Sequence, residues 1–141
     1  MAKSTAKLLE ELKSFSDFKR FFEENENDLQ TICLKDALNA CITEQGLNKA
    51  QVIQKSQLSE VYAYQIFSGT RCKPDRKKVL ALAFGMELDV EKTQQLLKST
   101  GYAPLYAKNP FDCIVIYALH KHYSLIKVNE MLYDYGQETI G

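Results

Sequence analysis

Apolar residues recur at every third or fourth position along most of the chain, which is the spacing of one face of an α-helix. No stretch shows the strict alternation of apolar and polar residues that is typical of a half-buried strand. The pattern therefore predicts an all-α fold without a sheet. The predicted helices span residues 4–14, 17–22, 29–44, 48–55, 59–67, 75–85, 90–99, 110–122 and 125–135.

Short polar residues and glycines mark the ends of these predicted helices. A polar side chain just before a helix accepts a hydrogen bond from a free amide of the first turn, and a glycine just after it adopts the left-handed conformation that ends many helices. The expected N-caps are Asn48, Ser59, Asp89 and Ser124. The expected terminating glycines are Gly46, Gly69, Gly85, Gly101 and Gly136.

The organisation of the chain follows from the strength of the helical pattern and its breaks. In the helix predicted at 29–44, the apolar positions are Ile32, Leu34, Leu38, Cys41 and Ile42. The segment 102–110, YAPLYAKNP, is predicted as a linker because its prolines lack amide donors and restrict the residues before them. We expect an N-terminal helical arm at 1–28, a core domain at 29–101, and a two-helix extension at 102–141 that packs on the core.

The composition is that of an ordinary globular protein. The chain has 141 residues, of which 45% are apolar and 26% charged, enough to bury the core of one domain. No apolar run approaches the roughly 20 residues that a membrane span needs. The beginning of the chain, MAKSTAKLLEELKSF, lacks the uninterrupted apolar stretch of a secretory signal. We therefore expect a cytoplasmic protein that does not contact a membrane.

Residues that often carry chemistry form no catalytic or metal-binding pattern. The four cysteines share no C-x2-C spacing, and His120 and His122 are two positions apart, so that on one helix they point in different directions. The sequence also lacks a Gly-rich phosphate loop and a G-x-S-x-G turn. We therefore expect no enzymatic activity, no metal site and no cofactor.

The net charge is zero, but the charges are distributed unevenly. Residues 46–80 carry seven Lys/Arg against two Asp/Glu, a balance of +5. Residues 1–45 have a balance of −3 and residues 81–141 a balance of −2. A local basic excess is what neutralising phosphate groups requires. The block at 46–80 is therefore the candidate surface for a nucleic acid.

Two short predicted helices joined by a tight turn, 48–55 and 59–67, lie inside this basic block. Such a pair is typical of a helix-turn-helix, in which the second helix enters the major groove of DNA. The residues expected to face the core are Val52, Ile53, Leu58, Ala63 and Ile66. The residues expected on the outer face of the second helix are Glu60, Val61, Tyr64, Gln65 and Ser68.

The segment LNKAQVIQKSQLSEVYAYQIFSGTRCKPDRKKVLALAFGMEL has a recognisable order: a capped helix, a turn, a serine-started helix, a glycine, a basic loop with a proline, and a Leu-Ala-rich helix. In this order it resembles the Cro/repressor (XRE-type) helix-turn-helix family. The resemblance covers about residues 29–100 and implies a five-helix DNA-binding bundle. With the stretches YAYQIFSGTR and APLYAKNP, the whole chain is similar to small regulators of this type in Firmicutes-like bacteria.

The resemblance implies duplex DNA as the partner and a role in transcription regulation. Gln65 is expected to pair with adenine, and Val61 to contact a thymine methyl group. The residues implied in base contacts are Glu60, Val61, Tyr64 and Gln65. The residues implied in phosphate contacts are Lys49, Ser59, Ser68, Thr70, Arg71, Lys73 and Lys77. Gln57 stands where the family usually has a glycine, because the chain there tends to adopt a positive φ.

Two alternatives stay open from the sequence. Glu60 is acidic at the groove-facing start of the second helix, and Phe67 stands where a polar residue is common. These departures leave a protein-interaction module, an adaptor or antitoxin-like partner on a degenerate helix-turn-helix fold, as the alternative function. Apolar surface on the terminal helices also allows a homodimer, whose copies would bind half-sites about one helical turn apart.

Overall fold

The computed structural model describes residues 5–14 and 32–141. The described residues form eight α-helices and no strand, so the predicted all-α class is confirmed for them. The chain divides into two compact units, Met1–Thr31 and Ile32–Gly141, which are described separately. In the first unit the helix expected at 4–14 is confirmed as α1 (Thr5–Ser14). The helix expected at 17–22 lies outside the described residues.

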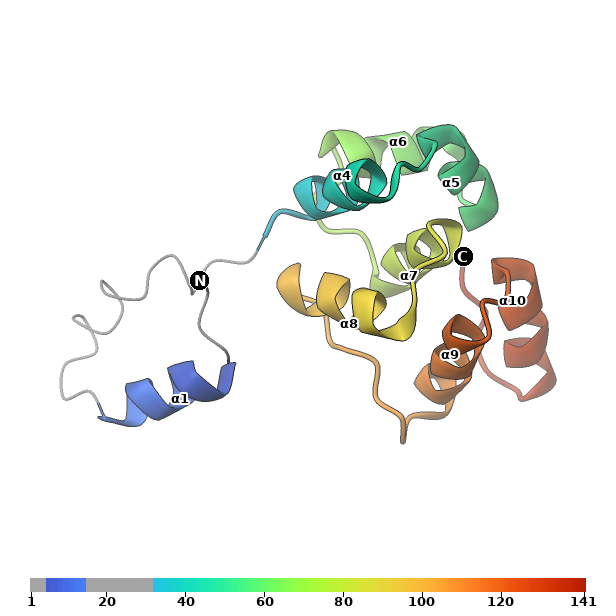
Figure 1. Cartoon of the computed structure of the whole chain (residues 1–141). Helices are drawn as coiled ribbons and strands as arrows, with labels where there is room; N and C mark the ends of the chain where they lie inside the picture. Colours follow the sequence, from blue (N-terminus) through green and yellow to red (C-terminus); the bar gives the residue numbers. More distant parts are fainter. Residues whose placement is uncertain (1–4, 15–31) are drawn as a thin grey trace. The chain divides into compact units, whose positions relative to one another are not determined.

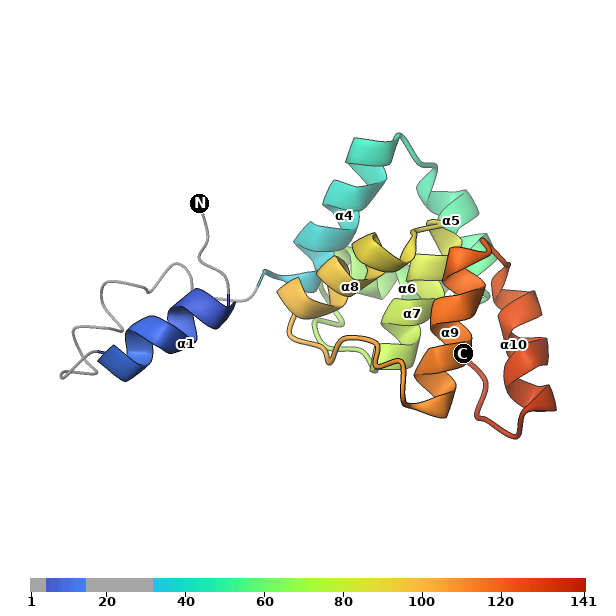
Figure 2. The ribbon, with the colours of Figure 1, turned by 60° about the horizontal axis from the view of Figure 1, so that its bottom comes forward.

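The second unit contains seven of the described helices, arranged around a central one (Figures 1 and 2). The central helix is α7, whose residues from Val79 to Gly85 are all buried. Helix α5 packs along α7, and α8 and α10 also contact α7. The bounds are α4 (Leu34–Gln45), α5 (Lys49–Ser56), α6 (Glu60–Ser68), α7 (Arg76–Gly85), α8 (Val90–Ser99), α9 (Pro110–His120) and α10 (Leu125–Asp134).

The four predicted N-caps are confirmed. The side chain of Asn48 accepts a hydrogen bond from the Gln51 amide, and that of Ser59 accepts one from the Tyr62 amide. Asp89 and Ser124 cap α8 and α10 in the same way. Each cap satisfies an amide that has no partner inside the helix, and replacing such a residue by alanine typically costs about 1 kcal/mol. The caps therefore fix where these helices start.

The first helix of the second unit starts later than predicted. Helix α4 begins at Leu34, and Ile32, expected inside this helix as one of its apolar residues, precedes it and is 53% exposed. The Ile32 amide donates to the Ser99 carbonyl at 2.9 Å, a bond to the end of α8 rather than to a helical neighbour. The prediction that the helix includes Ile32 is therefore wrong, because the Ile32 amide bonds to a distant segment instead of joining a helical turn.

Gly85 does not terminate α7 as predicted. It is the last helical residue, it is buried, and the left-handed conformation belongs instead to Glu87, at φ 56°. A Cβ atom at position 85 would overlap the Val52 carbonyl oxygen and lie 3.3 Å from Ser56 Cβ. The absent side chain thus lets the backbones of α5 and α7 approach closely. The reason for this glycine is packing.

The segment predicted as a linker is bound along its length to the helices around it. The Gln94 side chain donates to the Leu105 carbonyl at 2.9 Å and accepts from the Leu105 amide at 2.6 Å. The Arg76 guanidinium donates to the carbonyls of Ala103 and Pro104, and both its terminal nitrogens lie 2.9 Å from the buried Asp112 carboxylate. The path between α8 and α9 is therefore fixed by polar contacts to α7, α8 and α9.

Replacing Gly85 by alanine should destabilise the protein by about 1–3 kcal/mol, because the new methyl group meets backbone rather than a movable side chain. At a helical position with free space the same change is stabilising by about 1 kcal/mol. Chemical denaturation therefore tests the packing, because the sign of the change in unfolding free energy differs between these two cases. A more stable Gly85→Ala variant would contradict the close α5–α7 packing.

Gln57 follows α5 with φ 60°, the positive value expected for this turn position. Gln57→Gly should stabilise the protein by about 1 kcal/mol, because a side chain is strained in this region. The matched control is Gln54→Gly, an exposed site within α5, where glycine should cost about 1 kcal/mol. Denaturation midpoints of both variants test the strain, and a loss of stability in each would argue against it.

Candidate nucleic-acid interface

Helix α6 is held in place by one buried face. Ala63, Ile66 and Phe67 are between 0% and 4% exposed, and they pack into the core beside α4. The Asn39 side chain of α4 also donates to the Phe67 carbonyl at 3.1 Å, which joins the two helices near the end of α6. This anchoring leaves the opposite face of α6 accessible.

The accessible face gathers the residues predicted to contact bases. Val61 is 72% exposed and Tyr64 is 42% exposed. These two side chains lie in a shallow, open hollow on the surface of α6. The residues that line the hollow are Glu60, Val61, Tyr64, Gln65 and Ser68. The structure thus brings all four predicted base-contact residues together, and we call this surface the α6 face.

Arg71 is bound to the edge of the α6 face by three contacts. Its Nε donates to Gln65 Oε1 at 2.7 Å, and its backbone amide donates to the Gln65 carbonyl at 3.0 Å. Its guanidinium carbon lies 4.4 Å from the centroid of the Tyr62 ring, a cation–π distance. The sequence predicted separate roles for Gln65 and Arg71, whereas the structure makes them one hydrogen-bonded unit.

The hydroxyl groups predicted to contact phosphates lie at both ends of α6. Ser59 caps the start of the helix and accepts from the Tyr62 amide at 3.3 Å, which leaves the serine proton out of the cap. At the other end, the Ser68 hydroxyl lies 3.1 Å from the Thr70 hydroxyl, and both residues are exposed. Each end of α6 therefore carries a polar group that a phosphate oxygen can bind.

The predicted lysines are distributed over different surfaces. Lys49 Nζ lies 5.0 Å from the ring centroid of Phe67, beside α6. Lys73 Nζ lies 4.2 Å from the Tyr102 ring centroid and donates to the Thr100 carbonyl at 3.3 Å. Lys77 instead pairs with Glu138, near the end of the chain. The structure therefore places Lys49 beside the Phe67 ring of α6, on the side that packs on the core, and does not bring Lys77 to the α6 face.

Two further lysines lie near α6 that the sequence reasoning did not select. Lys78 Nζ lies 5.5 Å from the Tyr62 ring centroid, and it belongs to the basic block that charge counting found. The side chain of Lys35 runs over Gly69, where a Cβ atom would come within 2.7 Å of Lys35 Cδ. No sequence signal marked Lys35, because it reaches α6 only through the packing of α4. Within residues 32–141, none of the ion pairs involves either lysine.

Tyr102 ties the basic loop before α7 to the segment after α8. Its hydroxyl donates to the Pro74 carbonyl. Burial raises the pKa of the Tyr102 phenol, and the nearby Asp75 carboxylate raises this pKa further. Both effects favour the neutral phenol in the folded protein, where it serves as a donor.

Two other pKa shifts lie away from the α6 face. Burial, followed by the Glu44 carboxylate, raises the pKa of the Cys41 thiol. The hydrogen bond from Lys77 lowers the pKa of Glu138, which favours the charged form of that carboxylate. Neither residue contacts α6 through these interactions.

The described residues offer no grouping of His, Cys, Asp and Glu side chains that could hold a metal ion. Within the same residues, no helix has the length and apolar character needed to cross a membrane. All four cysteines are free thiols.

The fold defines the class of the protein as all-α over the described residues. Comparison of the chain with protein-family models, with curated proteins and with solved structures finds no match.

The Tyr102 hydrogen bond predicts a specific loss of stability in alkali. Because the folded-state pKa lies above the ordinary value of 10.0, the contribution is complete below that value and is lost as the pH rises through the folded-state pKa. Tyr102→Phe should cost about 1 kcal/mol at neutral pH and show a smaller further decline above pH ~10. Unfolding measured across pH tests this, and parallel curves for the two proteins would contradict it.

Proposed function

We propose that this protein binds duplex DNA sequence-specifically through the α6 face and regulates transcription. One observation carries the proposal: a short helix, anchored by its buried side, exposes a face with both polar and apolar residues. Cations lie beside this helix, and among the described residues they have no acidic partner. On this proposal α4 to α8 form a five-helix bundle of the Cro/repressor type, with α5 and α6 as its helix-turn-helix.

The dimensions of α6 suit the major groove. Its nine residues make a helix about 14 Å long at 1.5 Å per residue. The groove is about 12 Å wide and accepts one helix. Because the opposite side of α6 is buried against the core, the α6 face is the part of the helix that would meet the base edges.

The contacts of the α6 face suit two kinds of readout. Val61 offers an apolar group for a thymine methyl, and the Gln65 amide offers a donor and an acceptor for adenine. Arg71 holds the Gln65 oxygen, so that Gln65 presents its NH2 group in a defined orientation. Restricting a flexible side chain before binding lowers the entropy lost on binding.

The cations beside α6 would position the protein on the DNA backbone. Lys49 and Arg71 lie over the rings of Phe67 and Tyr62, two residues of α6, and these contacts limit the motion of both cations. Lys35 adds charge beside Gly69 at the end of α6, and Lys78 adds charge near the Tyr62 ring. Such contacts give affinity for any sequence, whereas the α6 face gives preference among sequences.

A protein-binding role is the second candidate. It is favoured by the apolar part of the α6 face, where Val61 and Tyr64 are exposed beside the acidic Glu60. Exposed aromatic and apolar residues are common in protein interfaces. An adaptor would bind a defined protein, and it would show little salt-dependent binding to duplex DNA.

Selection from a random duplex library, followed by footprinting, tests the proposal. An enriched sequence is expected, and a homodimer should protect two symmetric half-sites about one helical turn apart. If three phosphates are neutralised, affinity should fall about 40-fold between ~50 and ~200 mM salt. Failure to enrich any sequence, together with salt-independent binding, would contradict DNA recognition.

Variants of Gln65 and Arg71 test the contact map on the selected site. Gln65→Ala should cost about 1–3 kcal/mol and relax preference at one base position. Arg71→Ala should weaken binding to all sequences and also relax preference at that position, because it releases the Gln65 side chain. The double variant should therefore be non-additive by about 0.5 kcal/mol or more. Lys127→Ala on α10 removes the same charge from another surface and should leave binding unchanged.

A further inference from the structure

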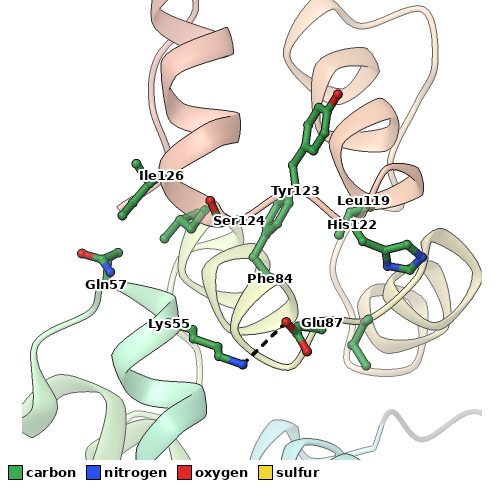
Figure 3. Close-up of a pocket in the computed structure, with 11 residues that line it drawn as sticks. Lys55, Gln57, Phe84, Glu87, Leu119, His122, Tyr123, Ser124 and Ile126 are labelled. Atoms are coloured by element: carbon green, nitrogen blue, oxygen red, sulfur yellow. Dashed lines mark ion pairs between the residues drawn. The ribbon is translucent and has the colours of Figure 1, made fainter.

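A cavity of about 240 Å³ lies where α5, α7, α9 and α10 meet, and it is separate from the α6 face (Figure 3). Its inner wall is apolar: Phe84, Leu119 and Leu125 are between 1% and 4% exposed. Water gains few hydrogen bonds against such a wall, so an apolar group is favoured there. One water molecule needs only about 10–15 Å³ of such space, so the cavity has room for a small organic molecule. The cavity therefore fits a small molecule with a short apolar body.

Three residues with positive φ line this cavity, and each follows the end of a helix. They are Gln57, Glu87 and His122, with φ between 56° and 60°, and they follow α5, α7 and α9. No other non-glycine residue in the described chain has positive φ. Backbone strain of this kind concentrates at ligand-binding sites. The three strained residues thus line the same cavity whose inner wall is apolar.

The mouth of the cavity carries one charge of each sign. Lys55 Nζ lies 3.6 Å from Glu87 Oε1, and the two side chains are 53% and 68% exposed. This distance is longer than that of a charged hydrogen bond, about 2.7–2.9 Å, so both groups keep free bonding capacity. Figure 3 shows the pair at the side of the cavity opposite Tyr123.

The helix ends around the cavity add partial charges of both signs. The carboxyl ends of α5, α7 and α9 carry partial negative charge, and the amino end of α10, at Leu125 and Ile126, carries partial positive charge. A ligand with a single charge would match only one of these poles. A ligand with an ammonium and a carboxylate on the same carbon atom matches both.

We infer that this cavity binds a free amino acid with a branched apolar side chain. Its side chain fills the space beside Phe84 and Leu119, its ammonium binds Glu87, and its carboxylate binds Lys55. The two ligand charges bind the two members of the loose ion pair, so no charge is left unpaired at the mouth. The inference concerns the free protein and does not depend on whether α6 binds DNA.

Leucine is the probe, and amide shifts in ¹H–¹⁵N NMR spectra of the full chain, without DNA, are the measurement. Saturable shifts are expected at Gln57, Glu87, His122 and Ser124. The matched probes are 3-methylbutylamine, which lacks the carboxylate, 4-methylpentanoate, which lacks the ammonium, and glycine, which lacks the apolar body. Each matched probe should bind at least about tenfold more weakly than leucine. The two singly charged probes lose one charged hydrogen bond, and glycine loses the apolar contact.

Two charge variants test the assigned roles. Glu87→Gln should weaken leucine about tenfold without weakening 4-methylpentanoate, because it removes a charge that repels this carboxylate. Lys55→Gln should likewise weaken leucine about tenfold without weakening 3-methylbutylamine. Both side chains are exposed and their pairing contributes little to folding, so the variants should fold. Glu130→Gln on α10 is the matched control. Absence of saturable shifts at these amides, or equal binding of leucine and either singly charged probe, would overturn the inference.

Discussion

The close approach of α5 to α7 is the constraint on which the rest of the second unit depends. Helix α7 is buried from Val79 to Gly85, and at Gly85 its backbone meets the Val52 carbonyl of α5. Contacts between backbones leave little room for adjustment, because no side chain can rotate away. The end of α5 is therefore fixed against the core. The turn that follows it starts from a fixed point, and this turn sets where α6 begins.

Local signals in the sequence predicted much of this fold. The caps at Asn48 and Ser59 and the positive φ at Gln57 depend on only a few neighbouring residues, so sequence reasoning placed them correctly. The outward residues of α6 were also predicted together, because a short helix with one buried face fixes its exposed face by periodicity. These successes share one feature, which is that each depends on a few neighbouring positions.

Features that depend on distant contacts were missed. The structural role of Gly85 requires knowing that α5 lies against α7, and the exposure of Ile32 follows from a bond to the end of α8. The pairing of Lys77 with Glu138 joins residues 61 positions apart, which no spacing rule relates. In the interface, the bond between Gln65 and Arg71 depends on the path of the loop after α6. Charge counting found the basic block, but packing decides which of its members reach α6.

The turn between α5 and α6 links the two candidate sites. Gln57 leaves the end of α5 at the cavity, and two residues later Ser59 caps the helix that carries the α6 face. Conformational preference alone would place a glycine at this position, as it would after α7 and α9. A residue with a side chain is found at all three, and all three line the cavity. Within the described chain, non-glycine residues with positive φ thus occur only around this cavity, and a glycine would relieve the strain at each of them. That is the pattern expected where side chains at helix ends serve a binding site rather than stability.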